Sequence, residues 1–194
     1  MSFLKQLRKA RGTDASKKLQ RARLIAWRRE PSIVKADHPT RLGAAKSVGY
    51  KAKQGVVVVR IRVPRGGKKR PMIKKGRRSK RKGVKLVLSK SYKSISEERV
   101  ARKYPNMEVL NSYLVGKDGR YYWHEVILID LNHPGILKDK QYSQLVMQTN
   151  RVFRGLTSSA KKSRGLRSNK GKGAEKLRPS RNSNMKRRKN LSRK

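Results

Sequence analysis

The sequence predicts a small α+β core, with a mixed or antiparallel sheet, packed helices and long basic extensions. The segment Met107–Asp130 contains two runs rich in Val, Ile, Leu and Tyr that flank Gly116–Gly119. An Asp-Gly step between such runs is a strong hairpin signal. The second run ends in four aliphatic residues, 126–129, so both faces of that strand should be covered. Seven of the eleven acidic residues fall between Glu97 and Asp139, which leaves the rest of the chain overwhelmingly basic.

The net charge of the chain indicates which class of partner it binds. The 194 residues include 55 Lys or Arg and 11 Asp or Glu, a formal net charge of +44. This length suits one domain with extensions or two small domains. A compact body with this charge repels itself, so we expect a polyanionic partner, nucleic acid first and an anionic membrane surface a distant second. Until it binds, part of the chain should be disordered.

Several other classes of protein are disfavoured. The chain has no cysteine, which excludes disulfides and cysteine-based zinc sites. Residues 1–12 lack the apolar run of a secretory signal. The longest aliphatic runs have four residues, far short of a membrane span. We therefore expect a soluble intracellular protein in the cytoplasm, with no membrane partner.

Residues 1–50 are expected to form a basic helical extension. Residues 2–11 have helical spacing. Thr13 can cap a second helix that runs to about Arg29, because Pro31 forbids its continuation. A third short helix is predicted over residues 39–46. The basic faces of these helices favour contact with phosphate. The apolar stripe of the second helix comprises Leu19, Ala22 and Ala26.

Residues 51–148 are expected to form the α+β core. Within Gly55–Val63, one face is aliphatic at every second position, while the other changes from Val56 and Val58 to Arg60 and Arg62. This pattern predicts a core strand whose far end emerges among charges. Residues 65–85 hold 12 Lys or Arg and no acid. They are interpreted as a basic loop, disordered alone and ordered on an anion.

The remaining core elements follow in order. Residues 84–88 form a candidate short strand. Ser94–Glu97 matches a capping box, which predicts a helix from there to Tyr104 with Glu97 in its first turn, where a carboxylate favours the helix dipole. A turn is expected at 132–135 and a weak helix at 142–147. Residues 149–194 form a basic C-terminal extension, since 17 of residues 151–194 are Lys or Arg.

The sequence contains no motif that indicates a catalytic site. The three histidines have no metal-ligand spacing. His124 and Glu125 are neighbours on a strand and point to opposite faces, which rules out an acid–base pair. The glycine-rich segment 165–173 is one residue too long for a phosphate-binding loop and has Gly173 where Ser or Thr should bind magnesium. We expect no enzymatic activity, no cofactor, no metal and no small-molecule substrate.

The basic residues fall into four separate blocks: the N-terminal helices, 41–53, 65–85 and 151–194. Because these blocks alternate with core elements, charge should radiate from several sides of the core. This arrangement favours burial among several nucleic-acid segments over a single groove-binding face. Only 6% of the residues are aromatic, too few for a single-strand stacking platform.

Four blocks carry a resemblance to a known family: PTRLGAAKSVGYKAKQGVVVVRIRV (39–63), KGRRSKR (75–81), YPNMEVLNSYLVGKDGRYYWHEVILID (104–130) and RVFRGLTSSAKKSRGLR (151–167). In this order they resemble the archaeal and eukaryotic ribosomal protein family L-fifteen-e, over roughly residues 28–179. Residues 1–18 do not match the family pattern, and 181–194 look like a lineage-specific addition. The resemblance implies a mixed antiparallel sheet with helices, basic extensions threaded through large-subunit ribosomal RNA, neighbouring large-subunit proteins as further partners, and no catalysis.

Carried onto matching positions, the resemblance implies an RNA-facing set of Arg41, Lys46, Lys51, Lys53, Arg77, Arg78, Lys80, Arg81, Arg151, Arg154, Arg164 and Arg167. The surrounding basic segments extend the expected set to Arg60, Arg62, Arg65, Lys74, Lys75, Lys170, Lys172 and Arg178. We therefore expect a structural constituent of the large ribosomal subunit that stabilises its RNA through Lys and Arg contacts with phosphates. Two alternatives stay open: a nucleic-acid-compacting chromatin-type protein, which composition alone would permit, and, less favoured, an enzyme that modifies RNA.

Overall fold

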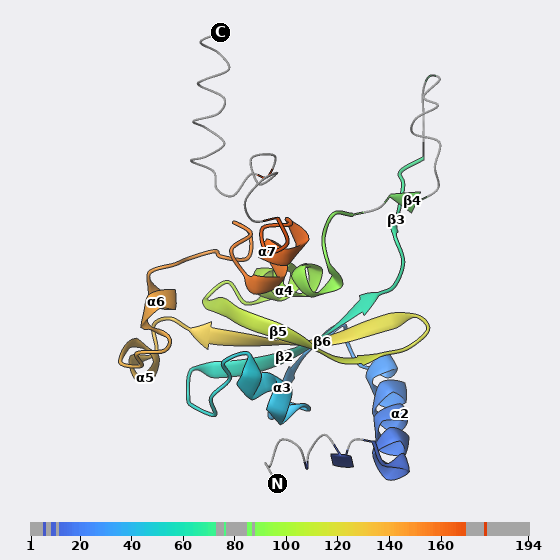
Figure 1. The fold of residues 1–194 in the computed structure, drawn as a ribbon, viewed down its shortest axis with the longest axis horizontal. Helices are drawn as coiled ribbons and strands as arrows, with labels where there is room; N and C mark the ends of the chain where they lie inside the picture. Colours follow the sequence, from blue (N-terminus) through green and yellow to red (C-terminus); the bar gives the residue numbers. More distant parts are fainter. Residues whose placement is uncertain are drawn as a thin grey trace.

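The computed structural model describes residues 6, 9–10, 12–72, 76, 85–86, 88–169 and 177. Its centre is a four-stranded antiparallel sheet in the order β1-β2-β6-β5 (Figure 1). The strands are β1 (Ile33–Ala36), β2 (Val56–Pro64), β5 (Met107–Lys117) and β6 (Tyr121–Asp130). Helices cover both faces of this sheet, so the predicted α+β class is confirmed.

The β5–β6 hairpin forms over the predicted residues. Its register places Tyr113 opposite Glu125, with irregularities between Val109 and Asn111 and between Leu114 and Gly116. The turn is stabilised by Asp118, whose Oδ1 accepts hydrogen bonds from the backbone N–H groups of Arg120 (2.7 Å) and Tyr121 (2.5 Å). An aspartate that bonds the backbone two or three residues on is a common stabiliser of turns.

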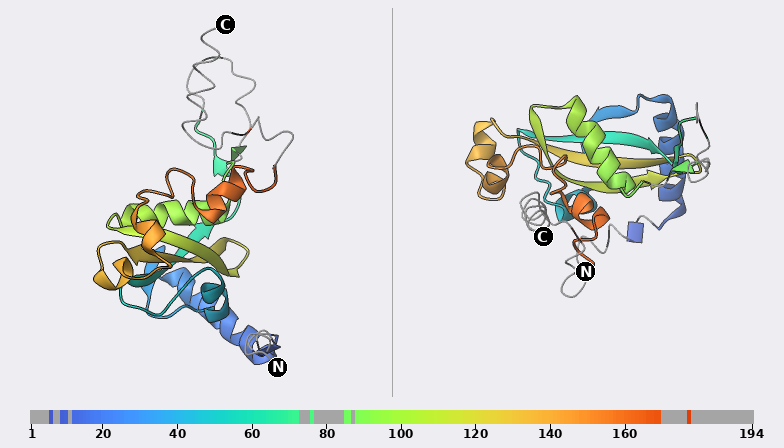
Figure 2. Two further views of the ribbon diagram at one scale, coloured as in Figure 1. Left: turned by 60° about the vertical axis from the view of Figure 1, so that its left-hand side comes forward. Right: turned by 90° about the horizontal axis from the view of Figure 1, so that it is seen from above.

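One face of the sheet packs against α4 (Tyr92–Lys103), and α7 (Ser158–Ser163) contacts α4 and β5 on the same side, as Figure 1 and the left view of Figure 2 show. Val59, Ile61, Val126 and Leu128 point into this layer, together with Val100 of α4. As predicted, one face of β2 is apolar at alternate positions and belongs to the core.

The opposite face packs against α2 (Asp14–Arg29) and α3 (Leu42–Ser47). Trp27 of α2 meets Trp123 there, with 6.3 Å between ring centroids, and Ile127 lies in the same cluster. Because Val126 and Leu128 face one layer and Ile127 the other, the predicted burial of both faces of β6 is confirmed.

The far end of β6 is closed by a third, smaller cluster. The helices α5 (Pro134–Leu137) and α6 (Ser143–Val146) follow β6 there, and Ile136 and Tyr142 pack against Ile129. The Tyr142 hydroxyl donates to the carbonyl of Gly49 at 2.8 Å. This contact ties the region of α6 to the loop after α3.

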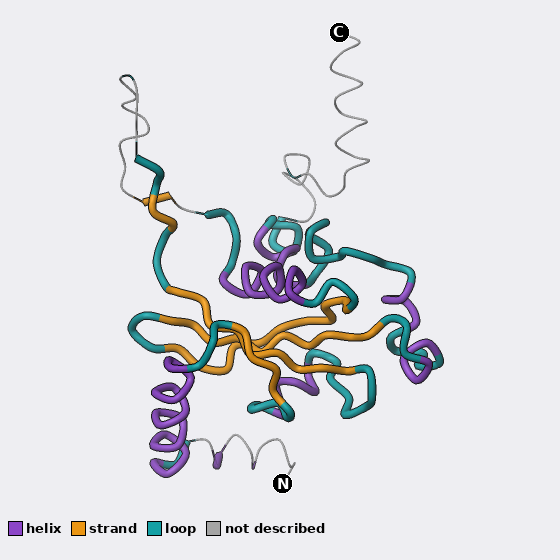
Figure 3. Tube along the Cα trace, turned by 180° about the vertical axis from the view of Figure 1, so that it is seen from behind, coloured by secondary structure: helices purple, strands orange, loops and turns teal. Residues whose placement is uncertain are grey.

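Helix α2 confirms the predicted bounds but not the predicted stripe. Thr13 caps it, since its side chain accepts a hydrogen bond from the N–H of Ser16 at 3.4 Å. The stripe that includes Leu19 is exposed, 52% for Leu19 itself, while Leu24 and Trp27 contact the sheet. The helix projects away from the sheet, as Figure 3 shows from behind. Of the expected helix at 2–11, residues 6, 9 and 10 are helical and the others lie outside the described residues.

Three elements differ from the sequence prediction. Strand β1 was not predicted; it pairs with β2 at the sheet edge. The segment 65–85 is not wholly irregular, because β3 (Lys68–Lys69) pairs with β4 (Lys85–Leu86). Helix α4 begins one turn early, capped by Ser91 rather than Ser94, so Glu97 lies mid-helix and fully buried rather than in the first turn.

Candidate nucleic-acid interface

The structure describes eleven of the twenty residues predicted to face RNA: Arg41, Lys46, Lys51, Lys53, Arg60, Arg62, Arg65, Arg151, Arg154, Arg164 and Arg167. The other nine lie outside the described residues: Lys74, Lys75, Arg77, Arg78, Lys80, Arg81, Lys170, Lys172 and Arg178. The described side chains divide into those held by contacts inside the protein and those that remain exposed. This division decides which of them are available to a partner.

The arginines of β2 lie against aromatic rings instead of emerging among charges. The Arg60 guanidinium carbon is 4.3 Å from the centre of the Trp27 ring, and the side chain donates to Glu30 at 2.5 Å. Arg62 lies 4.8 Å from the Tyr121 ring centre and donates to the Arg28 carbonyl. Each guanidinium group thus stacks on an aromatic ring and donates to an acceptor, and these contacts help to hold α2 on the sheet.

Arg65 continues this series beyond the end of β2. Its guanidinium carbon is 5.2 Å from the centre of the Tyr122 ring, and Nη1 donates to the Asp118 carbonyl at 2.6 Å. The Arg65 residue is nevertheless exposed. Arg65 therefore combines an internal hydrogen bond with a surface that a partner can reach.

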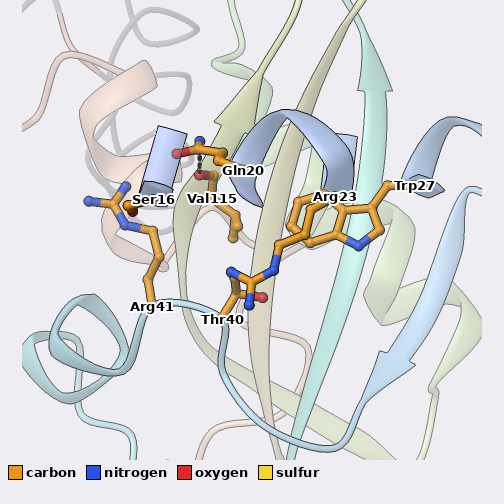
Figure 4. A pocket seen from close by; sticks show the side chains of 7 residues that line it. All are labelled: Ser16, Gln20, Arg23, Trp27, Thr40, Arg41 and Val115. Carbon is orange, nitrogen blue, oxygen red and sulfur yellow. Dashed lines mark hydrogen bonds between the residues drawn. The ribbon is translucent and has the colours of Figure 1, made fainter. Parts of the chain in front are cut away.

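Arg41 belongs to a pocket between α2 and the sheet (Figure 4). Its Nη1 donates to the carbonyl of Leu114 at 2.8 Å. Arg23 of α2 reaches the same pocket, and Trp27 lies beside it (Figure 4). None of the described residues that line this pocket is acidic, so two guanidinium groups share one hollow without a carboxylate.

A buried carboxyl group holds Arg41 in place through its neighbour. Glu125 is fully buried. It accepts hydrogen bonds from the Thr40 hydroxyl at 2.5 Å, from the Thr40 N–H at 3.1 Å and from the Tyr113 hydroxyl. Burial and this hydrogen bond to Glu125 raise the pKa of Tyr113. The sequence indicated only that Glu125 and His124 face opposite ways; the structure confirms this, since His124 Nδ1 lies 3.0 Å from Ser96 Oγ on the α4 side.

Lys51 and Lys53 converge on one carboxylate. Their Nζ atoms lie 3.2 Å and 2.7 Å from Asp139 Oδ2. The hydrogen bond from Lys53, supported by the Gln141 N–H and by Lys51, holds the pKa of Asp139 well below its usual range. The two lysines retain about 39% and 48% exposure of their side chains. Part of their charge is thus already balanced inside the protein.

The C-terminal arginines behave differently from one another. Arg151 is half-buried and donates to the Val109 carbonyl at 3.1 Å, and burial lowers its pKa. Arg164 donates to the Gly155 carbonyl at 3.2 Å. Arg154 and Arg167 are exposed, as is Lys46 of α3. Of the predicted C-terminal set, Arg154 and Arg167 present their side chains outward.

A cationic cluster that the sequence did not single out lies at the start of α4. The Ser91 N–H donates to Ser163 Oγ at 3.0 Å and brings the end of α7 to this point. Burial lowers the pKa of Lys93, the charge of Glu97 opposes this shift, and the nearby charges of Lys162 and Arg167 add to it. Within the described ranges, none of these three cations is within ion-pair distance of an acid. Only the helix packing reveals the cluster, because Lys93 is distant in sequence from the other two.

The acidic residues explain why so much positive charge stays outside. Of the described acids, Glu97, Glu108, Glu125 and Asp139 are buried, and Asp118 pairs with Arg28 at 2.7 Å. The other described acids are Asp14, Glu30, Asp37, Glu98 and Asp130, of which Asp14 and Asp37 are exposed. Four of the ten described carboxyl groups are thus buried, and the described surface keeps an excess of positive charge.

Two features of the described part of the chain concern metal binding and membrane crossing. Its His, Asp and Glu side chains do not gather in groups of three that a metal ion would need. Across the same ranges, no helix has the length and apolar character required to cross a membrane.

A comparison with protein-family models matches residues 1–184 to the family described as Ribosomal L15. The match confirms the resemblance seen in the four sequence blocks. It also corrects both expected limits of the family pattern, since it includes residues 1–18 and extends to residue 184, four residues into the tail 181–194 that was expected to be an addition.

Proposed function

The chain belongs to the Ribosomal L15 family, and from this premise we propose that it binds and stabilises large-subunit ribosomal RNA through Lys and Arg contacts with phosphates. The family is structural rather than enzymatic, and its members are constituents of the large ribosomal subunit. The ribosome is therefore where this chain acts, among ribosomal RNA and other ribosomal proteins. The residues and the chemistry of the RNA contact are the part that we propose.

One observation carries the proposal: four of the described acids are buried, while exposed cations lie on several sides of the sheet. Exposed Lys18, Arg21 and Arg29 lie on α2, on one side of the sheet, while Arg154 and Arg167 belong to the segment on the other. Cations that displace counterions from several RNA segments at once give tight binding that weakens as salt rises. A core with basic limbs on both sides suits a crowded RNA environment better than one duplex groove.

The buried carboxyl groups of Glu125 and Glu97 give the core a second role in this proposal, because they hold the basic segments in place. Residues 51–148 form most of the core, which β1 and Trp27 complete, and this core sets where the basic parts of 1–50 and 149–194 leave it. Glu125 fixes the approach of residues 40–41 to the sheet, and Glu97 fixes the segment of α7. Limbs directed in this way reach different RNA segments with less loss of conformational entropy on binding.

The test uses the basic run outside the described residues. Arg77→Glu plus Arg78→Glu in the full chain should weaken binding to large-subunit RNA in a filter-binding titration while circular dichroism of the core is unchanged. Unchanged RNA affinity would contradict the assignment of this run.

Sedimentation separates the proposal from its alternatives. An integral ribosomal protein should co-sediment with the large subunit in a sucrose gradient at low and at high salt, because its release also requires unfolding of the surrounding RNA. Migration with DNA, together with equal affinity for duplex DNA, would favour the chromatin-type alternative. Binding of a methyl donor or nucleotide in calorimetry would favour the RNA-modifying enzyme.

A further inference from the structure

A polar groove separate from the Arg41 pocket shares no described lining residue with that pocket. It has a volume of ≈ 670 Å³, within the range of about 300–1,000 Å³ usual for ligand sites. Its walls come from the loop after α3, strand β5, the region of α6 and the segment 151–161. These walls are joined by the Tyr142 hydroxyl and by Gln141 Nε2, which donate to the Gly49 carbonyl at 2.8 Å and 3.3 Å.

One wall of the groove presents glutamine amides. Gln141, Gln144 and Gln148 all line it; Gln144 lies in α6 (Ser143–Val146), and the other two lie just before and just after this helix. Gln144 and Gln148 are exposed, and neither side chain makes a hydrogen bond to another described residue. Each amide offers two N–H donors and one carbonyl acceptor, the combination that pairs with the edge of a nucleobase.

The segment 151–161 lines the groove with cations. Arg151, Arg154 and Lys161 line the groove, and none of its described lining residues is acidic. Arg154 and Lys161 are exposed. Arg151 is anchored by the Val109 carbonyl, yet its buried Nε has no hydrogen-bond acceptor among the described residues. Positive charge without a carboxylate favours an anionic occupant.

Apolar side chains from the same segments and from β5 also line the groove. Leu110, Leu145 and Leu156 line the groove, and Met147, which also lines it, is 88% exposed. A methionine thioether packs well against the face of an aromatic ring. The groove thus combines amides, an apolar surface and cations within one hollow, as a nucleotide combines a base edge, a base face and a phosphate.

We infer that this groove holds an unpaired RNA nucleotide, with its base between Met147 and the glutamines and its phosphate at Arg154 and Lys161. The inference rests on the proposed function and adds to it a contact with a base. An unpaired nucleotide is favoured over a duplex because the base edges of A-form RNA are largely out of reach of side chains in its deep, narrow groove. The cationic wall favours RNA over a segment of a neighbouring protein.

The first experiment separates base contacts from phosphate contacts. Full-length wild type and the variant Gln144→Ala plus Gln148→Ala are titrated with a mixed-sequence single-stranded RNA and with duplex RNA of the same length, over a series of salt concentrations. The variant should bind the unpaired RNA about tenfold more weakly, since one well-placed amide pair contributes that much discrimination. Its salt slope and its affinity for the duplex should not change, because a neutral amide displaces no counterion.

Two further variants serve as comparisons. Gln54→Ala, an exposed glutamine outside the groove, should bind both RNAs like wild type. Arg154→Gln plus Lys161→Gln should flatten the salt slope for unpaired RNA by roughly 0.7 for each phosphate that the variant no longer neutralises. Equal weakening of unpaired and duplex binding by the glutamine variant, or none, would overturn the inference. If wild type keeps its steep salt slope in that case, the proposed function stands; if wild type binds no RNA, the proposed function itself fails.

A cross-link in the assembled particle identifies the occupant. A photoreactive phenylalanine analogue replaces Met147, an exposed apolar residue that lines the groove, and large subunits that contain it are irradiated. A covalent adduct to ribosomal RNA at an unpaired nucleotide is the expected product. An adduct to another ribosomal protein would instead assign the groove to a protein segment and overturn the inference.

Discussion

The Arg60 guanidinium carbon lies 4.3 Å from the centre of the Trp27 ring while the same side chain donates to Glu30 at 2.5 Å. Trp27 and Glu30 stand at the end of α2 and just after it, and Arg60 stands in the middle of β2. One side chain therefore joins the N-terminal helix to the sheet. With 13% of its side chain exposed, Arg60 acts within the protein and contributes little of itself to an RNA surface.

Replacing this guanidinium should cost stability. Arg60→Lys keeps the charge but loses the planar guanidinium group that stacks on Trp27 and donates to Glu30. We expect the free energy of unfolding to fall by about 1–2 kcal/mol. Urea denaturation measures the change. Lys46→Gln, at an exposed cation on α3, should change stability by less than about 0.5 kcal/mol. Unchanged stability with weaker RNA binding in Arg60→Lys would instead make Arg60 a direct RNA contact.

The buried histidine predicts a dependence of stability on pH. His124 is 3% exposed, and burial, aided by the charge of Lys93, lowers its pKa to about 4. Between pH 6.5, the ordinary pKa of histidine, and pH 4, the His124 side chain therefore binds a proton in the unfolded chain but not in the folded chain. The free energy of unfolding should then fall as pH drops from about 6.5 to 4, by up to about 3 kcal/mol.

Urea denaturation at a series of pH values tests this linkage. His124→Gln removes the titrating group, so the loss of stability between pH 6.5 and 4 should shrink in this variant relative to wild type. His38→Gln, at an exposed histidine, should reproduce the wild-type curve. The same pH dependence in wild type and His124→Gln would show that other groups account for it.

The carboxylate shared by two lysines predicts a change in salt dependence. Asp139→Asn removes the partner of Lys51 and Lys53, so both cations become available to phosphate. We expect the slope of log affinity for ribosomal RNA against log salt to steepen by up to roughly 0.7 for each lysine freed. Asp37→Asn adds the same net charge at an exposed acid that pairs with no described cation, and should steepen the slope less. Equal slopes in the two variants would contradict the shared-carboxylate account.

The elements that the sequence predicts best are those with strong local signals. The Asp-Gly turn, the run of four aliphatics in β6 and the Thr13 cap act through neighbouring residues and appear where expected. Strand β1 was not predicted because four residues, Ile33–Ala36, are too few for a periodic pattern, and pairing with β2 supplies their order. The start of α4 was misplaced because Ser91 and Ser94 both suit a cap, and the contact of Ser91 with Ser163 comes from the tertiary fold.

The candidate site could be predicted from the sequence even less completely than the fold, because it depends on contacts between distant residues. Sequence identifies which segments are cationic, but Arg60 and Arg154 look alike in it. Only the packing shows that Arg60 meets Trp27 and Glu30, about thirty residues away, while Arg154 is exposed. The glutamine wall was missed for a related reason: only the fold brings Gln141, Gln144 and Gln148 to the same groove as the cations of the segment 151–161.

The buried carboxyl of Glu97 joins α4, β5 and the segment of α7. Its Oε1 accepts from Ser112 Oγ at 2.5 Å, and its Oε2 accepts from Thr157 Oγ1 at 2.7 Å and Ser159 Oγ at 2.5 Å. Thr157 is also the cap of α7. Because α7 has only six residues, and isolated helices of that length are marginal in water, these hydroxyl contacts should decide whether the segment stays on the core.

Glu97→Gln keeps the shape of the side chain but replaces one acceptor oxygen by an N–H₂ donor, which cannot accept a hydroxyl proton. We expect a loss of about 1–3 kcal/mol and faster amide hydrogen exchange in residues 151–166, while β2 and β6 keep their protection. Glu98→Gln changes the neighbouring, partly exposed acid that pairs with Lys90 at 2.7 Å and should leave exchange in 151–166 unchanged, since such pairs contribute little. Equal exchange in the two variants would mean that apolar packing of Val152 and Ala160, rather than Glu97, holds the C-terminal limb on the core.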